Sequence, residues 1–486
     1  MDIYNFDSNL DGGKQISKQT FLGEGAYGCT YTPGLNCDGK TNKSKYSVNK
    51  IQEINFLSKN EVEISQSVKK IKGYKSRFVP INKSCIVNFN KIVNSKDIVS
   101  NCDLFDNYDL FDNYSNTDTI NFINKQYFMF YMKRINGITI KSASTIINTN
   151  YQFHDFFYHA LYYLLNSIYL LNRNKIIHND LHTDNIIYDD FAKIPYIIDF
   201  GLSYKHKNLF KNTNLSKAFD YPRIKNFFFS WRDHTQEKWS HLIEKKFISF
   251  IIYNNSNRFQ SNVDSDNTKN ILTKEIVDIF INDILTVYVN NVNNVNNVNN
   301  VKLIFTQNEY LEFFTMLKNY YYKFLPENDV NGKYIYYSSI LEELIPFVFK
   351  FNDLYSLIYC FIKIFNINYV NMKNDSANFI DIYDKFIKPL FKKIFYPDPN
   401  YRLSTRQFIS IFGYVFKFCQ SIDVEDLNNN KYISKFNDDF KLFLKEINYE
   451  YDMFFNKKFA YLDFNLILEK NNVMFIKNFN FNFNIM

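Results

Sequence analysis

The sequence has few features of three classes of protein. It lacks the cysteine spacing of zinc or disulfide proteins, the blocks of like charge of nucleic-acid binders and the long hydrophobic runs of membrane proteins. Its six cysteines form no Cys-x-x-Cys pair and no His/Cys cluster. A zinc site or a disulfide framework is therefore not expected, and a reducing compartment fits best. Glycine, proline and tryptophan are also scarce, at 12, 9 and 2 of 486 residues. With abundant Asn, Ile and Lys, this reflects AT-rich coding, so we give it no mechanistic weight.

Charge and hydropathy point away from nucleic acids and membranes. The net charge of +7 comes from Lys and Arg that are scattered along the chain, which is typical of a solvated surface. The N-terminal MDIYNFDSNLDGG is polar and acidic, unlike a signal peptide. The most apolar stretches, YHALYYLLNSIYLL and LYSLIYCFIKIF, are too short or too polar to span a bilayer. We therefore expect an intracellular, cytoplasmic chain with no nucleic-acid or membrane partner.

Apolar residues are plentiful, at 46%, and their patterns predict an α+β chain. In residues 15–135, FLGEGAYGCTYT predicts a glycine hairpin, and KYSVNKI, FVPINKSCIVNF and KQYFMFYMKRI predict strands. SKNEVEISQSVKKI predicts a helix, for which Ser58 and Glu61 form a plausible capping box. Helices dominate residues 136–422. The helical spacing of FHDFFYHALYYLLNSIYLLNRN and the apolar FNDLYSLIYCFIKIF predict two core helices.

The remaining segments are harder to interpret. We treat 1–14 as a tail, 206–345 as a long inserted or activation region with helix-like pieces, and 423–486 as a C-terminal extension. The tract VNNVNNVNNVNN has a period of three that suits neither a strand nor a helix. We interpret 289–301 as a disordered, Asn-rich linker.

The stretch IIHNDLHTDNIIYDDFAKIPYIIDFG places polar groups between short buried strands. Asp180 lies in the loop after the first apolar run, where a carboxylate could accept or orient a hydroxyl proton. Asn185 follows five residues later, and Asp199 begins an Asp-Phe-Gly turn. An amide oxygen and a carboxylate are hard ligands suited to Mg²⁺. This spacing predicts a general base and two metal ligands around a transferring phosphoryl group.

A second group of residues could hold phosphates. Gly23, Gly25 and Gly28 give a Gly-x-Gly-x-x-Gly hairpin whose backbone N–H groups could approach phosphate oxygens, although an ordinary glycine turn uses the same letters. Lys50 lies on the strand that follows this hairpin. A carboxylate would have to hold its ammonium in place, and Glu61 on the following helix is the natural candidate, unless it serves only as a cap. Glu63 is the fallback partner.

Taken together, these residues resemble the eukaryotic-type protein kinases, closest in style to serine/threonine kinases of large DNA viruses. GEGAYG resembles the glycine-rich loop, HNDLHTDN the catalytic loop and DFG the metal-binding turn. Asp353 in NDLYSL resembles the buried aspartate that braces the catalytic loop, and DPNYRLS resembles the late motif whose arginine pairs with a glutamate. The resemblance implies ATP and Mg²⁺ as cofactors and Asp180, Lys50, Glu61 and His182 as catalytic residues. It implies Asn185 and Asp199 as metal ligands and Leu22, Gly23, Glu24, Gly25, Ala26, Tyr27, Gly28, Thr30 and Lys50 as nucleotide-binding residues.

The implied fold is two-lobed, with a small, mainly β N-lobe that carries one αC helix and a larger helical C-lobe, interrupted by the long insertion after the Asp-Phe-Gly turn. The implied activity is transfer of the ATP γ-phosphoryl group to Ser/Thr hydroxyls of a protein substrate, in the cytoplasm, or in a host cytoplasm or virion for a viral chain.

The sequence departs from the family pattern at four places. Asn179 replaces the usual arginine beside the base, so we expect activity that does not depend on activation-loop phosphorylation. His182 replaces a lysine, a pattern shared with small-molecule phosphotransferases. No clear Ala-Pro-Glu is visible, and Arg402 has no identified acidic partner. A small-molecule phosphotransferase and a catalytically weak pseudokinase scaffold therefore remain alternatives.

Overall fold

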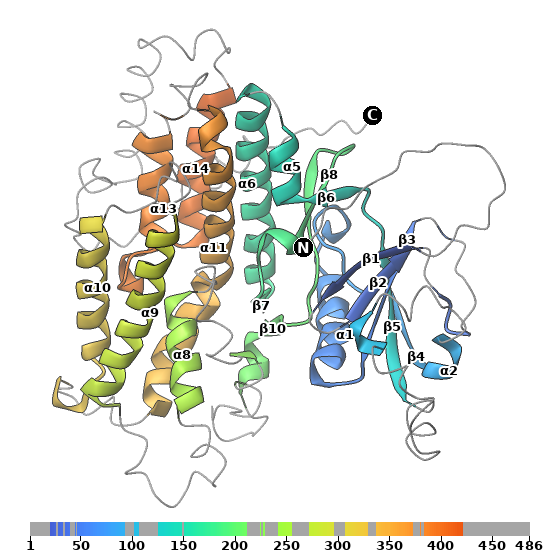
Figure 1. Ribbon diagram of the computed structural model, residues 1–486, viewed down its shortest axis with the longest axis horizontal. Helices are drawn as coiled ribbons and strands as arrows, with labels where there is room; N and C mark the ends of the chain where they lie inside the picture. Colours follow the sequence, from blue (N-terminus) through green and yellow to red (C-terminus); the bar gives the residue numbers. More distant parts are fainter. Residues whose placement is uncertain are drawn as a thin grey trace, which may run out of the picture. The chain divides into compact units, whose positions relative to one another are not determined.

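The chain has two compact units, Met1–Asn136 and Gly137–Met486 (Figure 1). The computed structural model describes residues 20–25, 28–32, 35–38, 44, 46–92, 102–105, 125–147, 150–210, 224, 227–228, 242–254, 272–295, 307–328, 337–372, 380 and 383–420. The first unit is built on an antiparallel sheet and the second is mainly helical, so the α+β class is confirmed.

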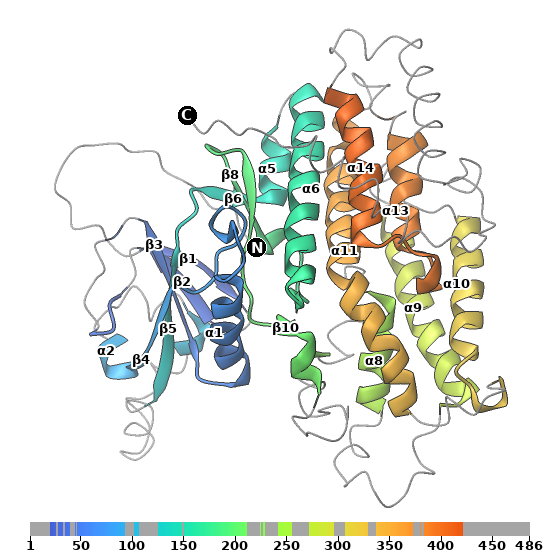
Figure 2. The same ribbon diagram turned by 180° about the vertical axis from the view of Figure 1, so that it is seen from behind.

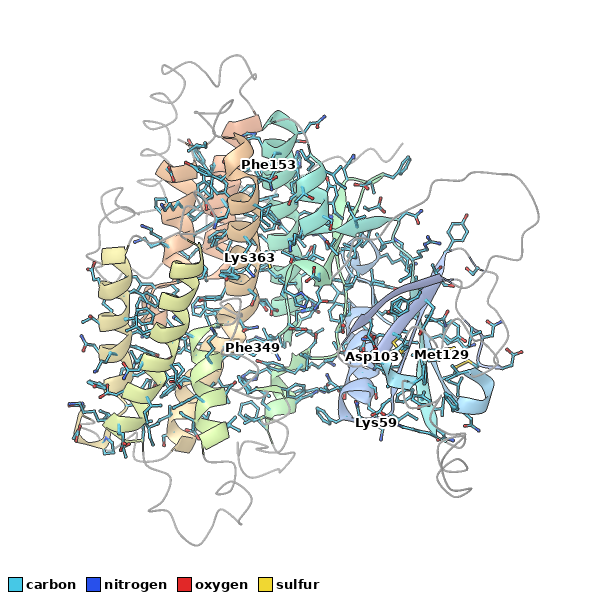
Figure 3. All side chains as sticks on the ribbon, viewed as in Figure 1. Lys59, Asp103, Met129, Phe153, Phe349 and Lys363 are labelled. Atoms are coloured by element: carbon cyan, nitrogen blue, oxygen red, sulfur yellow. A yellow bond between two sulfur atoms is a disulfide. The ribbon has the colours of Figure 1, made fainter. Side chains whose placement is uncertain are left out.

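An antiparallel sheet in the order β1-β2-β3-β5-β4 forms the frame of the first unit. The central strands are buried over several consecutive residues, and one core cluster of the unit includes Tyr31, Ile51 and Met129, the last marked in Figure 3. The predicted hairpin and strands are confirmed. The bounds are β1 Thr20–Gly25, β2 Gly28–Thr32, β3 Ser47–Glu53, β4 Lys83–Asn88 and β5 Gln126–Lys133.

Helix α1 (Phe56–Val68) follows β3 after a two-residue turn. Its N-cap is Asn55, whose side chain accepts from the Ser58 N–H at 3.0 Å, while the Ser58 hydroxyl accepts from the Asn55 N–H at 2.8 Å. The predicted capping box of Ser58 with Glu61 is therefore wrong. Strand β3 ends early enough for Asn55 to start the helix, which leaves the Glu61 side chain available for another contact. Short helices complete the described part of this unit: α2 Phe89–Ile92, η1 Tyr74–Ser76 and η2 Asp103–Phe105.

Long helices form the core of the second unit, where α6, α11 and α14 lie side by side (Figures 1 and 2). All six apolar positions that predicted the first core helix, from Phe153 to Leu171, are buried in α6. The helix bounds are α5 Ile140–Ile146, α6 Asn150–Arg173, α8 Ile243–Asn254, α9 Lys274–Val295, α10 Gln307–Tyr322, α11 Tyr337–Met372, α13 Lys388–Ile394 and α14 Thr405–Gln420.

Short strands connect these helices to the loops that carry the polar motifs. Strand β6 pairs with β8, which pairs with β9, and β7 pairs with β10. The three apolar runs of the polar-motif stretch are thus strands, as predicted. The strand bounds are β6 Gly137–Thr139, β7 Ile176–Ile177, β8 Ile186–Asp189, β9 Ile194–Ile197 and β10 Tyr204–Lys205. Single turns occur at η4 Thr183–Asn185, η5 His206–Leu209, η8 Pro326–Asn328, η9 Tyr383–Ile387 and η10 Pro399–Tyr401.

Helix α11 is longer than its sequence pattern predicted. Within the described residues it contains one stretch, Ser339–Tyr369, that is long and apolar enough to cross a membrane. The scored window is 72% buried inside the protein, and the core helix of a soluble protein passes the same test. The helix extends beyond the predicted segment 351–365 at both ends, since it starts at Tyr337 and ends at Met372.

The repeat at 289–301 is only partly described, and there the prediction of a disordered linker is wrong. Helix α9 continues through Val295, because extending an existing helix costs less than starting one and Asn is tolerated within it. The tail 1–14 and the extension 423–486 lie outside the described residues.

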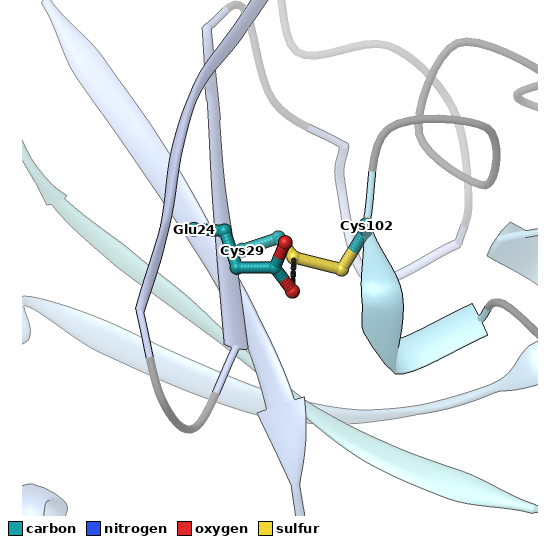
Figure 4. A group of neighbouring side chains, drawn as sticks. All are labelled: Glu24, Cys29 and Cys102. Atoms are coloured by element: carbon teal, nitrogen blue, oxygen red, sulfur yellow. Dashed lines mark hydrogen bonds between the residues drawn. A yellow bond between two sulfur atoms is a disulfide. The ribbon is translucent and has the colours of Figure 1, made fainter. Parts of the chain in front are cut away.

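Two disulfides link distant segments of the first unit, which corrects the expectation that the cysteines form no disulfide framework. Cys29 on β2 is bonded to Cys102 beside η2 (Figure 4), and Cys37 is bonded to Cys85 on β4. Among the described residues, Glu24, Cys29 and Cys102 also form a cluster of possible ligand atoms within 4.8 Å. Because the two sulfurs are bonded to each other, they are not thiolate ligands for a metal. The cysteines therefore give no reason to expect a reducing compartment.

The Cys29–Cys102 bond should stabilise the first unit. The two cysteines are 73 residues apart, so breaking the bond restores a long loop to the unfolded chain. We expect Cys29→Ser/Cys102→Ser to lower the free energy of unfolding by about 2–4 kcal/mol. Urea unfolding followed by circular dichroism measures it. Cys360→Ser, at a buried free cysteine, is the control for loss of a thiol alone. Equal stability of wild type and double variant under oxidising conditions would show that the bond does not form.

Candidate active site

A buried ion pair joins β3 to α1 in the first unit. Lys50 Nζ lies 3.2 Å from Glu61 Oε2, and both side chains are buried. Gln52 Nε2 donates to the same carboxylate oxygen at 3.3 Å. Removing two charges from water is costly and often gives no net stability. The pair therefore has a better explanation as a means of fixing the ammonium than as a stabilising contact. Glu63, the fallback partner, is exposed on α1.

The glycine hairpin continues the same sheet. Leu22, Gly23, Glu24 and Gly25 lie on β1, with an irregularity at Leu22, and Gly25 pairs with Gly28 at the start of β2. A Cβ at Gly28 would lie 2.2 Å from the Ile51 carbonyl oxygen, so the strand can approach β3 this closely only with glycine there. Ala26 and Tyr27 lie outside the described residues.

The register places Thr30 opposite Lys50. The sheet thus carries the predicted phosphate-binding strands beside the lysine.

A carboxylate on α11 holds the catalytic-loop candidate in the second unit. Asp353 is buried, and its two oxygens accept the N–H groups of His178 at 2.8 Å and Asn179 at 3.0 Å. These amides follow strand β7 directly. The bidentate contact confirms the sequence comparison at Asp353, because charge-assisted bonds to two successive amides fix the loop at the residue before Asp180.

Asp180 and Asn185 are brought together within that loop. The Asn185 amide nitrogen donates to the Asp180 carbonyl at 2.8 Å and lies 3.3 Å from its Oδ2. Asn185 is buried, while Asp180 remains partly accessible. Because Asp180 occupies the amide nitrogen of Asn185, the amide oxygen is the atom suited to a cation.

Asp199 is tied to the same loop through its neighbour. The Ile198 N–H donates to the Asn185 carbonyl at 3.0 Å, and the Ile198 carbonyl lies 2.9 Å from His178 Nε2. Asp199 itself has φ 58°, a left-handed conformation that Asp tolerates better than most residues, and its Oδ1 accepts from the Gly201 N–H at 3.1 Å. Such backbone conformations are concentrated at functional sites. His178 is fully buried and packs against Phe200.

His182 lies between two carboxylates. Its Nε2 is 3.8 Å from Asp180 Oδ2, and its Nδ1 is 3.5 Å from Asp184 Oδ2. Hydrogen bonding by His182 lowers the pKa of Asp184, against the effect of its burial. The same Nδ1 lies 3.3 Å from the Asp184 N–H. A neutral ring can accept from that amide, whereas a charged ring would donate to the carboxylate. The ring of His182 therefore links Asp180 to Asp184 within the loop.

Sequence reasoning missed the acidic partner of Arg402, which the structure identifies as Glu244 on α8. The guanidinium donates twice to this carboxylate, with N–O distances of 2.9 and 2.8 Å, and both side chains are buried. Burial alone would lower the pKa of Arg402, but the carboxylate of Glu244 raises it above its usual value. Glu244 is thus the acidic partner that the sequence left unidentified. The segment HLIEKK lacks Ala-Pro before its glutamate, so only an acidic residue at a helix start could have hinted at it.

Asn179, where arginine was expected, connects three segments. Its amide nitrogen donates to the Leu202 carbonyl at 3.0 Å and to the Phe227 carbonyl at 3.1 Å. Its own carbonyl accepts from Lys245 Nζ at 2.8 Å. Neutral hydrogen bonds and a buried lysine thus tie the loop before Asp180 to segments after the Asp-Phe-Gly turn.

Comparisons with known proteins give little beyond this geometry. No protein-family model matches the chain, and neither does any curated protein. Among solved structures, the chain is similar to the kinase PK-1 of the Cydia pomonella granulovirus. The identity is 13% and the TM-score 0.26, over 49% of this chain and 70% of that one. A similarity this weak is not evidence of function.

Proposed function

We propose that this chain is an ATP-dependent protein kinase that transfers the γ-phosphoryl group of Mg-ATP to Ser/Thr hydroxyls of protein substrates. The observation that carries the proposal is the buried pair of Lys50 and Glu61. A lysine kept charged and immobile by a carboxylate at the edge of a glycine hairpin is suited to nucleotide phosphates. The braced loop with Asp180 and Asn185 supports it from the second unit.

The donor sets fit the two cofactors. Asn185 and Asp199 offer an amide oxygen and a carboxylate, which are hard donors of the kind that Mg²⁺ takes. The backbone amides of Gly23, Gly25 and Gly28 and the ammonium of Lys50 are suited to ATP phosphates. When bound, the metal would neutralise charge on the transferring group.

Each residue would have a separate task. Lys50 would bind phosphate oxygens, and Glu61 would keep its ammonium in position. Asp180, partly exposed, would accept the hydroxyl proton of the acceptor or orient that hydroxyl. Asn185 would hold Asp180 in place through its amide nitrogen. His182, whose ring lies beside Asp180, would stand where the protein kinases have a lysine.

His182 also suits small-molecule phosphotransferases, so the sequence motif alone does not define the acceptor. Two contacts favour a protein substrate: the Asp353 brace and the buried pair of Arg402 with Glu244 resemble the lower-lobe framework of protein kinases. Labelled ATP with casein-type proteins, aminoglycosides and sugars as acceptors decides the class. We expect label on protein Ser and Thr. Label only on a small molecule would replace the proposal with the alternative.

Replacing Glu61 tests the ion pair. In Glu61→Gln the ammonium of Lys50 loses its buried counter-charge, so we expect kcat/KM for ATP to fall about 10- to 100-fold. Glu63→Gln removes an exposed carboxylate two residues along the same helix and should keep wild-type kinetics. Steady-state kinetics with varied ATP measure both. Equal losses in the two variants would mean that Glu61 has no special role.

The contacts of Asn179 predict independence from phosphorylation. The segments that a phosphate would have to organise are already bonded to Asn179 through the carbonyls of Leu202 and Phe227. We expect phosphatase treatment to change the transfer rate less than twofold, measured after the phosphatase is removed. A large loss of rate, restored by incubation with ATP, would contradict this.

A further inference from the structure

A group of basic side chains lies in the second unit, and none of them belongs to the candidate active site. A cavity of about 460 Å³ is lined by Asn174, Lys175, Lys205, His206, Lys207, Pro346 and Phe349. Four of these side chains are basic, and none of the described residues that line the cavity carries a carboxylate. Cavities of this volume are in the range of small-ligand sites.

The backbone brings these cations together. Lys205 on β10 pairs with Ile176 on β7, and the His206 N–H donates to the Lys175 carbonyl at 3.3 Å. Lys175 has φ 59°, in a turn between α6 and β7. The C-terminus of α6 would attract one cation through its dipole, which accounts for Lys175. It does not account for three further basic residues contributed by a different segment.

Phe349 on α11, marked in Figure 3, forms an apolar wall of the cavity. The His206 ring meets Phe349 edge-on with ring centroids 4.9 Å apart, and Lys175 Nζ lies 5.9 Å from the Phe349 centroid. The site therefore offers cations around an apolar surface. Burial lowers the pKa of His206, and the charge of Lys175 lowers it further. A bound dianion would oppose both effects.

We propose that this basic cavity binds a phosphate-bearing ligand, with the lysines and His206 contacting the phosphate and Phe349 with Pro346 contacting the group that carries it. Three lysines and an imidazole match a phosphomonoester dianion better than a carboxylate, which has half its charge. The volume leaves room for a carrier beside the phosphate. The inference is independent of the proposed activity, because it uses no residue assigned to phosphoryl transfer.

The cavity is also connected to the catalytic loop by short paths. Lys175 is separated from His178 only by the two residues of β7, and Phe349 lies one helical turn before Asp353 on α11. An occupant that holds Lys175 and Phe349 thus contacts both elements that position the loop. The experiment measures binding of a phosphate ligand to this cavity.

The test is calorimetric titration of the full-length chain at low salt with O-phosphoserine and, separately, with inorganic phosphate. Lys175→Gln/Lys207→Gln removes two exposed cations of the cavity and should weaken binding at least tenfold. The control is Lys274→Gln, since Lys274 also lies over an aromatic ring, that of Tyr322, but in a cavity shared with Glu327. It should bind as the wild type does. Lys207→Gln alone serves if the double variant fails to fold.

A second readout follows His206 directly. NMR titration of histidine-labelled protein should show its pKa rising when either ligand is present, because the bound negative charge favours the imidazolium form. Tighter binding of O-phosphoserine would show that the carrier is read, whereas equal binding would show that phosphate alone suffices, and both support the site. Absence of binding, unchanged affinity in the double variant, or loss of binding in Lys50→Met instead would overturn the proposal.

Discussion

Asp180→Asn is expected to lower the rate of phosphoryl transfer by about 10²–10⁴-fold while ATP still binds. In the proposed function the carboxylate takes or orients the acceptor proton, and an amide cannot accept it. The loop should survive the change, because Asp353 holds it through backbone amides and Asn185 also donates to the Asp180 carbonyl. Initial rates with labelled ATP, beside calorimetric ATP binding, measure the two effects separately.

Asp190→Asn is the matched control for that variant. Asp190 is an exposed carboxylate ten residues away, in the turn between β8 and β9. It should transfer phosphate at the wild-type rate. Turnover that persists in Asp180→Asn would remove Asp180 from the chemistry, and loss of ATP binding along with turnover would assign it to nucleotide binding instead.

Arg402→Leu is expected to be the most destabilising single change among those considered. It leaves the buried carboxylate of Glu244 without a counter-charge, which typically costs about 3–5 kcal/mol. It also leaves the carbonyls of Tyr396 and Pro397 without the N–H donors of the guanidinium. Urea unfolding followed by circular dichroism should show a clearly lower midpoint for the helical unit.

Two further variants distinguish the cost of leaving a buried carboxylate unpaired from the cost of losing an ion pair. Arg402→Met/Glu244→Leu removes both charges and should recover much of the lost stability. Lys318→Gln breaks a pair with Asp278 that is as short, at 2.7 Å, but partly exposed to solvent, so its effect should be small. A double variant no more stable than Arg402→Leu would show that the packing around Arg402, rather than the unpaired carboxylate, sets the cost.

Local patterns were sufficient to predict the elements that carry the candidate site. The strands beside Lys50, the helix from Phe153 and the strand ends around Asp180 follow from two- and 3.6-residue periodicities, which depend on near neighbours only. The Asp353 contact could be predicted because a family motif surrounds it.

Contacts between distant residues could not be predicted in this way. Glu244 and Arg402 are 158 residues apart, and nothing around Glu244 marks it as a partner. The cysteine pairs likewise have no local signal, since the register of the sheet and the segment before β5 bring Cys29 to Cys102. The start of α1 was misplaced by three residues because Asn55 and Ser58 are both good caps, and the end of β3 decides between them.

Transfer of label from the γ-position of ATP tests the proposed protein kinase activity most directly. Wild-type chain, a protein acceptor and Mg²⁺ are incubated with ATP labelled at either the γ- or the α-phosphate, with and without a chelator. We expect label on the acceptor from the γ-position only, abolished by the chelator and by Lys50→Met. A folded wild-type chain that leaves every acceptor unlabelled, or that transfers equally well with Met at position 50, would contradict it.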